Sequence, residues 1–93
     1  MVKRRPAVVV SNPAYHQTRP DVILGLLTSQ APAEAGLTDY PLQDWAAAGL
    51  RAPSIFRAFL ATLPSTQATV IGHLSTRDWQ EVQARLRAAL ALS

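Results

Sequence analysis

Residues 21–28 read Asp-Val-Ile-Leu-Gly-Leu-Leu-Thr, and this stretch decides the fold class of the chain. It contains the longest strongly apolar run, Val22 to Leu27, which is far shorter than a bilayer-spanning helix requires. A short apolar run of this kind predicts a buried strand. Gly25, in the middle of the run, predicts a bulge or a close backbone approach.

The sequence before this strand predicts another strand. Residues 7–10 read Ala-Val-Val-Val, a β-branched run that is closed by the turn-forming residues Ser11-Asn12-Pro13. The polar connection over residues 12–20 contains two prolines, and we expect one helical turn around residues 14–16. The first part of the chain is therefore expected to supply two buried strands.

The middle of the chain carries weaker signals. Residues 29–38 are rich in Ala, Pro and Gly and predict a loop, whereas residues 39–45 could begin extended. Residues 44–49 (Asp-Trp-Ala-Ala-Ala-Gly) predict a short helix that ends at Gly49. Residues 69–74 (Thr-Val-Ile-Gly-His-Leu) predict a short strand.

Residues 53–63 (PSIFRAFLATL) fit either a helix or a strand. The apolar positions with helix-like spacing are Ile55, Phe56, Phe59, Leu60 and Leu63. The Phe and Ile content and the flanking Pro53 and Pro64 favour a strand instead. We therefore predict a strand here.

The C-terminal part predicts an amphipathic helix over residues 76 to about 92. Ser75 and Asp78 fit a capping box, in which the hydroxyl and the carboxylate bond to free N–H groups of the first turn. Glu81 and Arg85 are four residues apart in the order that favours an ion pair. The apolar face, which we expect to pack on the sheet, consists of Trp79, Val82, Leu86 and Leu90.

These elements predict a mainly β (α+β) fold, with a small sheet of mostly antiparallel strands followed by one C-terminal α-helix. Ninety-three residues with 48% apolar side chains can form one modest core, so we expect a single domain over residues 1–93. The basic N-terminus is followed by an apolar run too short for a secretory signal, and we expect a cytoplasmic protein.

The composition excludes several classes of protein. The chain has no cysteine, which rules out a disulfide scaffold, a thiol nucleophile and cysteine-based metal sites. Two histidines and few carboxylates argue against a histidine-rich metal site. The formal charge of +3 is mild and fits an anionic partner without requiring one.

The residues by themselves leave the function open. The chain contains no glycine-rich phosphate loop, no Gly-x-Ser-x-Gly elbow and no zinc signature. His73 lies in a predicted strand and is expected to be structural, while Arg77 and Arg87 are expected to be solvated on the helix. The three aspartates Asp39, Asp44 and Asp78 show no spacing typical of a two-carboxylate site.

The order of the motifs resembles the MazF/PemK family of bacterial toxins. Residues 3–15 (KRRPAVVVSNPAY) match the family's Arg-Pro strand start, and residues 21–30 (DVILGLLTSQ) match its apolar strand ending in Thr-Ser-Gln. Residues 40–58 contain a Gly-Leu-x-x-Pro-Ser stretch, and residues 71–90 are similar to the family's terminal Gly-x-Leu-Ser-x-x-Asp helix. The resemblance covers almost the whole chain.

The resemblance implies an SH3-like β-barrel with a terminal helix, usually a homodimer, that acts as an endoribonuclease on single-stranded RNA. It also implies a cognate antitoxin that blocks the site, and neither a metal nor a cofactor. The implied catalytic pair is Arg5, before the proline, and Thr28, at the end of the next strand. The residues that we expect to contact RNA are Arg4, Pro6, Ser11, Asn12, Ser29 and Gln30.

The implied reaction suits these residue types. RNA supplies its own nucleophile, the 2′-hydroxyl, so the protein has to stabilise charge on the phosphorane and move protons. A guanidinium offers planar donors that match phosphate oxygens, and a threonine hydroxyl can donate to a non-bridging oxygen or orient the 2′-hydroxyl. Arg5 is not expected to be the general base, because arginine keeps its proton. His16 is a weak candidate for that role.

The chain departs from the family pattern in two places. The family normally opens with a Gly-Asp-Ile-Val strand and a loop before the Arg-Pro, and residues 1–93 lack them, so we expect a domain truncated at the N-terminus. The strand over residues 7–12 should then have an unpaired edge. Three situations would account for it: the true start codon lies upstream and adds the missing strand, a dimer partner pairs with the edge, or the chain is an inactive remnant that is poorly soluble alone. We favour the first. The family's acidic-Gln-Val-Lys/Arg stretch is replaced by residues 57–61 (Arg-Ala-Phe-Leu-Ala), so its substrate contacts are not carried over.

Two alternatives to a toxin nuclease remain. One is a truncated or decayed member of the family that binds an antitoxin or nucleic acid without cutting. The other is a small SH3-like module that binds protein or nucleic acid. An upstream reading frame for a short acidic protein would favour the toxin.

Overall fold

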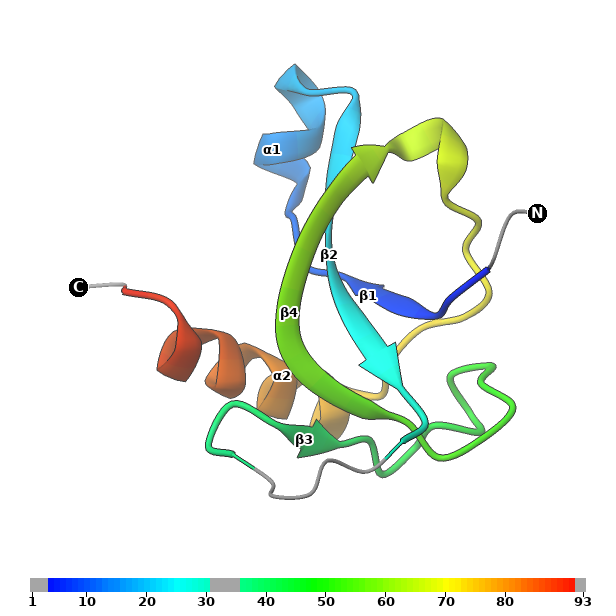
Figure 1. The fold of residues 1–93 in the computed structure, drawn as a ribbon. Coiled ribbons are helices and arrows are strands. Elements are labelled where there is room, and N and C mark those ends of the chain that lie inside the picture. Colours follow the sequence, from blue (N-terminus) through cyan, green and yellow to red (C-terminus); the bar gives the residue numbers. More distant parts are fainter. Residues whose placement is uncertain (1–3, 31–35, 92–93) are drawn as a thin grey trace.

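The computed structural model describes residues 4–30 and 36–91 and contains one antiparallel sheet and one long helix (Figure 1). The strands are β1 (Ala7–Val9), β2 (Asp21–Thr28), β3 (Tyr40–Pro41) and β4 (Ile55–Pro64). The helices are α1 (Pro13–Thr18), the 3-10 turn η1 (Ser65–Gln67) and α2 (Thr76–Ala89). The predicted fold class is confirmed.

The four strands lie in the order β1-β2-β4-β3, and every neighbouring pair is antiparallel. β4 is long and strongly bent, so that the sheet curves into half of a barrel (Figure 1). Within the described residues β1 is an edge strand, as expected for this Val-rich segment. The strand predicted over residues 53–63 is confirmed as β4.

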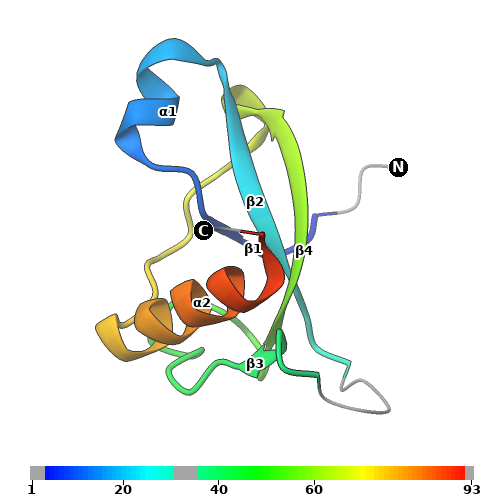
Figure 2. The ribbon, with the colours of Figure 1, turned by 90° about the vertical axis from the view of Figure 1, so that its left-hand side faces the viewer.

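The core lies between one face of the sheet and α2. Figure 2 shows α2 on one side of β2 and β4 and the chain that enters β1 on the other side. The residues of this core are Val8, Leu27, Tyr40, Leu42, Phe56 and Val82. The predicted helix face is confirmed for Val82, which is fully buried, but Leu90 at its end is 41% exposed.

Gly25 marks the irregularity that the sequence predicted. The pairing of β2 with β4 changes register between Gly25 and Leu27. A Cβ atom at Gly25 would collide with the ring of Phe56, which is fully buried. The glycine therefore allows the largest fully buried side chain to lie against the backbone of β2.

Two predicted elements are absent from the described residues. Residues 69–74 form no strand, and Val70 and Ile71 are 75% and 63% exposed because no neighbouring strand pairs with them. His73 is therefore an exposed loop residue and not a strand residue. Residues 44–49 form a series of turns and not a helix.

The turns over residues 44–49 pack directly against residues 71 and 72. Gly49 has a φ of +92°, and a Cβ atom there would be 2.6 Å from the carbonyl oxygen of Ile71. A Cβ atom on Gly72 would collide with the carbonyl of Ala48. Two glycines thus let two irregular segments touch backbone to backbone, which explains how this connection is held without a strand.

The start of α2 is capped, but not by the predicted box. Ser75 Oγ accepts a hydrogen bond from Asp78 N (3.2 Å), as expected. The Asp78 carboxylate is fully buried and accepts instead from the hydroxyl of Tyr40 (2.7 Å) and the backbone N–H groups of Gln43 (3.0 Å) and Asp44 (2.8 Å). Asp78 thereby links α2 to β3 and the turns that follow it. Burial, and then the bond to Asp78, raises the pKa of Tyr40 to about 12.

A second polar link lies beside Asp78. Arg77 donates to both carboxylate oxygens of Asp44 (3.2 and 2.8 Å), and the Ser75 hydroxyl donates to the same group (2.5 Å). These bonds, first of all those from Arg77, lower the pKa of Asp44. The expectation that Arg77 is only solvated is therefore wrong. Within the described residues, no helix has the length and apolar character needed to cross a membrane.

Candidate active site

Arg5 and Thr28 lie opposite each other across the first two strands. β1 and β2 pair with Ala7 opposite Leu26, and Leu27 N donates to the carbonyl of Pro6 (3.2 Å), so the same register continues beyond the end of β1. Extended two residues beyond the start of β1, this register brings Arg5 opposite Thr28. Residues directly opposite in an antiparallel pair project from the same face of the sheet, with Cβ atoms about 4.5–5.5 Å apart.

The face that carries both residues is the one that α2 does not cover. Val8 and Leu27 belong to the core against α2, so alternation along each strand turns Arg5 and Thr28 to the other side. There they line one open hollow of about 400 Å³. The residues that line it are Arg5, Leu26, Leu27, Thr28, Arg57 and Phe59.

A bulge in β4 brings Arg57 and Phe59 into the same hollow. Gly25 pairs with Leu60 and Leu27 pairs with Phe56, so residues 57–59 of β4 stand opposite Leu26 alone. Ala58, between the two side chains, has a φ of +54°, a left-handed conformation that a non-glycine residue rarely adopts. Its side chain packs toward the core, which leaves Arg57 and Phe59 on the open face.

Arg57 and Phe59 were not among the functional residues predicted from the sequence. Residues 57–61 depart from the family pattern, so no substrate contacts were carried over to them. The available signal was their i, i+2 spacing, which in a strand places both side chains on one face. Which face that is depends on the bulge, and the bulge was not visible in the sequence of β4.

Arg57 is held in place by a carboxylate. Its Nε atom lies 3.5 Å from Asp39 Oδ1, and the Asp39 side chain is only 9% exposed while that of Arg57 is half exposed. Asp39 is itself fixed, since it accepts from Gly36 N (2.9 Å) and its carbonyl accepts from Arg85 Nε (3.2 Å). The hollow therefore has one guanidinium on the strand entering β1 and another anchored on β4.

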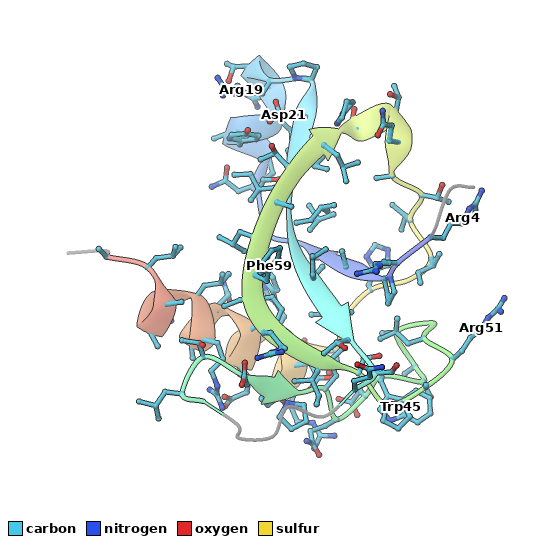
Figure 3. The ribbon with its side chains drawn as sticks, in the orientation of Figure 1. Arg4, Arg19, Asp21, Trp45, Arg51 and Phe59 are labelled. Carbon is cyan, nitrogen blue, oxygen red and sulfur yellow. The ribbon has the colours of Figure 1, made fainter. Side chains whose placement is uncertain are left out.

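Thr28 can act as a hydrogen-bond donor in the hollow. Its Oγ1 atom accepts from the backbone N–H of Gln30 (3.2 Å), which fixes the side chain and leaves its own proton for donation. Ser29 and Gln30 follow Thr28 and are exposed, next to the hollow but not among the residues that line it. Arg4 points away from the sheet (Figure 3), and Pro6 contributes its carbonyl to the register described above.

Ser11 and Asn12 lie at the other end of β1, away from Arg5 and Thr28. Asn12 Oδ1 accepts from Tyr15 N (3.0 Å) and caps α1. Ser11 Oγ accepts from Ile23 N (3.0 Å) and is 2.6 Å from Nε2 of His16. The structure thus does not bring these residues together with the predicted catalytic pair, and both side chains bond within the fold. His16 is likewise not among the residues of the hollow.

The hollow combines two cations, a hydroxyl donor and an exposed aromatic ring. Guanidinium groups bind phosphate oxygens through several donors, and a hydroxyl can donate to the same group. Phe59 is 65% exposed and offers a flat apolar surface beside these donors. Among residues 4–30 and 36–91, no three His, Cys, Asp or Glu side chains are gathered as metal ligands. The arrangement can therefore hold a phosphodiester next to a base.

Comparison with known proteins agrees with the order of motifs in the sequence. The family described as PemK-like, MazF-like toxin of type II toxin–antitoxin system matches residues 1–90. No curated protein matches the chain at a significant level.

Several solved structures share the fold. A Mycobacterium tuberculosis toxin, MazF-mt6, is 20% identical with a TM-score of 0.78, over 96% of this chain and 88% of that one. An endoribonuclease in complex with its cognate antitoxin, from a mycobacterial species, is 20% identical with a TM-score of 0.79, over 96% and 82%. A MazE–MazF structure from Deinococcus radiodurans is 24% identical with a TM-score of 0.74, over 97% and 84%. At these identities the likeness concerns the fold.

Proposed function

This chain belongs to the PemK-like, MazF-like toxins of type II toxin–antitoxin systems, and from that membership we propose that it is an endoribonuclease that cleaves single-stranded RNA without a metal ion and so inhibits growth. The observation that carries the proposal is the position of Arg5 opposite Thr28, on the open face of the sheet and in one hollow. One of the solved structures with this fold is described as an endoribonuclease.

Arg5 and Thr28 supply the charge stabilisation that the reaction needs. The RNA 2′-hydroxyl attacks the adjacent phosphorus and gives its proton to solvent, the P–O5′ bond breaks as O5′ takes up a proton from solvent, and the products are a 2′,3′-cyclic phosphate and a 5′-hydroxyl. Arg5 donates to the oxygens of the phosphorane, where negative charge is greatest, and Thr28 donates to a non-bridging oxygen. Because the nucleophile comes from the substrate, the mechanism requires neither an activated water nor a metal.

The RNA strand lies along the open face on both sides of this pair. Arg4, Pro6, Ser29 and Gln30 flank Arg5 and Thr28 in the sequence and are exposed, so they are placed to contact the neighbouring nucleotides. Ser11 and Asn12 are left out of this contact set, because they lie at the other end of β1.

We further propose a homodimer and a cognate antitoxin as partners. Structures with this fold include an endoribonuclease in complex with its cognate antitoxin and a MazE–MazF structure. An antitoxin segment that carries carboxylates would be attracted to the two guanidiniums of the hollow and would exclude RNA from it.

The test is cleavage of a long RNA by the purified protein in EDTA, with the cut sites mapped and the new ends identified. The proposal expects cuts in unpaired regions, ending in cyclic phosphate and 5′-hydroxyl. A strict requirement for a divalent metal would overturn the mechanism. RNA that is bound but never cut would favour the non-catalytic alternative.

A further inference from the structure

The bulge at residues 57–59 exposes an aromatic ring to solvent, and an exposed apolar ring is unfavourable in water. Phe59 is 65% exposed, although neighbouring positions of β4 carry buried or half-buried side chains. The ring projects on the open face because three residues of β4, two more than in regular pairing, stand opposite Leu26. Bulges re-aim side chains and are common beside active sites.

The bulge that exposes the Phe59 ring also contains a strained backbone conformation. Ala58 has a φ of +54°, a left-handed conformation that a residue with a Cβ atom rarely adopts. The conformation persists because Ala58 packs against the core while its two neighbours face outward. Figure 3 shows Phe59 in the middle of β4, well separated from Trp45.

The neighbours of Phe59 are groups that bind phosphate. The ring lines the hollow together with Arg5 and Thr28, and Arg57 on the other side of Ala58 is anchored by Asp39 (3.5 Å). An aromatic face beside guanidiniums is the combination that binds unpaired nucleotides, since the ring stacks on a base while the cations hold the backbone. A paired base is already stacked in its duplex and is not free to do this.

We propose that Phe59 is a positioning residue that stacks on an unpaired base next to the scissile phosphate, and that Arg57 holds the adjoining phosphate. The inference rests on the proposed function and adds how the site selects single strands. Because every base has a flat face, the ring contributes affinity for unpaired RNA with little dependence on sequence.

The experiment measures binding of fluorescently labelled 2′-O-methyl oligonucleotides, which lack the nucleophile and stay intact. The set comprises a mixed-sequence single strand, the same strand in a duplex, and a strand of equal length with abasic residues. The protein variants are wild type, Phe59→Ala, Phe59→Trp and, as a matched control, Val70→Ala. Val70 is an exposed apolar residue outside the hollow.

Loss of the ring should weaken binding of the mixed single strand by about 10-fold to 100-fold, as for other base–aromatic contacts. Phe59→Trp should bind as tightly as wild type, and Val70→Ala should be unchanged. The abasic strand should bind wild type weakly and lose nothing further in Phe59→Ala. Because the ring is exposed, the unfolding midpoint of Phe59→Ala should match that of wild type.

Three results would overturn the inference. In the first, Phe59→Ala binds the mixed strand as tightly as wild type. In the second, the substitution weakens binding of the abasic strand by the same factor as binding of the mixed strand. In the third, Phe59→Ala is a monomer in sedimentation where wild type is a dimer, which would mean that a second copy covers the ring. Failure of the proposed function looks different, because wild type would then cut no RNA and bind none of the strands. Wild-type cutting together with unchanged binding by Phe59→Ala would reject the inference alone.

Discussion

Arg5, just before β1, and Thr28, at the end of β2, line the same hollow, and their substitution tests the catalytic assignment directly. Arg5→Ala should lower the cleavage rate by about 100-fold or more, since it removes the donor to the developing charge. Thr28→Ala should reduce the rate strongly, and Thr28→Ser should keep part of it because the hydroxyl is retained. Single-turnover cleavage of a mapped RNA measures all three. Wild-type rates in both alanine variants would show that the site lies elsewhere.

Gly25 has no side chain, and this leaves room in the core for the ring of Phe56. In Gly25→Ala the new methyl group would meet the buried ring of Phe56, and overpacking of this kind costs about 1–3 kcal/mol. Gly36→Ala is the matched control, because the nearest atom to its Cβ, an oxygen of Asp39, is 3.7 Å away. Urea unfolding of both variants checks the prediction, and equal midpoints would contradict it.

At the scale of elements, Asp78 joins α2 to β3 and the turns over residues 44–49. Asp78→Ala would leave the Tyr40 hydroxyl and the N–H groups of Gln43 and Asp44 without their acceptor, and we expect a loss of at least about 3 kcal/mol. Glu81→Ala removes only a part-buried pair with Arg85, four residues along the same helix, and should cost about 0.5 kcal/mol or less. Denaturant titrations compare the two; a loss below about 1 kcal/mol for Asp78→Ala would mean that this link is not structural.

The same link predicts a loss of stability at alkaline pH. Burial raises the pKa of Tyr40 from 10.0 to about 12, so the folded protein keeps a phenol proton that the unfolded chain releases. The resulting stability is complete below pH 10 and is lost as the pH rises toward 12, by about 2–3 kcal/mol in all. Unfolding free energies at pH 9 to 12 measure it. Tyr40→Phe should remove this part of the pH dependence, and an unchanged profile in that variant would contradict the assignment.

At the scale of the whole molecule, a net charge of +3 and two guanidiniums in one hollow predict salt-dependent RNA binding. Each phosphate contact with a single strand contributes about −0.7 to the slope of log affinity against log salt concentration. Arg57→Gln should therefore reduce the steepness of the slope by about 0.7. Arg51→Gln, an exposed arginine outside the hollow, is the control and should change it less. Affinity that does not vary with salt would argue against an RNA substrate.

The strands and the terminal helix were predictable because their signals are local. The apolar runs at residues 7–10 and 21–28 became β1 and β2, and the serine before α2 caps that helix as expected. Residues 69–74 carry the same kind of local signal and form no strand, since a strand also needs a partner and none lies beside them in the described structure. The local sequence pattern thus indicated which segments can adopt an extended conformation. Whether such a segment forms a strand depended on a neighbouring strand in the sheet.

The candidate site divides in the same way. The order of the motifs along the chain was enough to recognise the family and to point to Arg5 and Thr28. The tertiary structure brought both residues to one hollow, added Arg57 and Phe59 to it, and showed that the side chains of Ser11 and Asn12 bond within the fold. The position of Asp78 in the sequence predicted a helix cap, whereas in the structure its buried carboxylate links α2 to β3 and the turns that follow. The physical reason is that a side chain's neighbours depend on strand register and on the bulge in β4, and both are set by contacts between segments far apart in the chain.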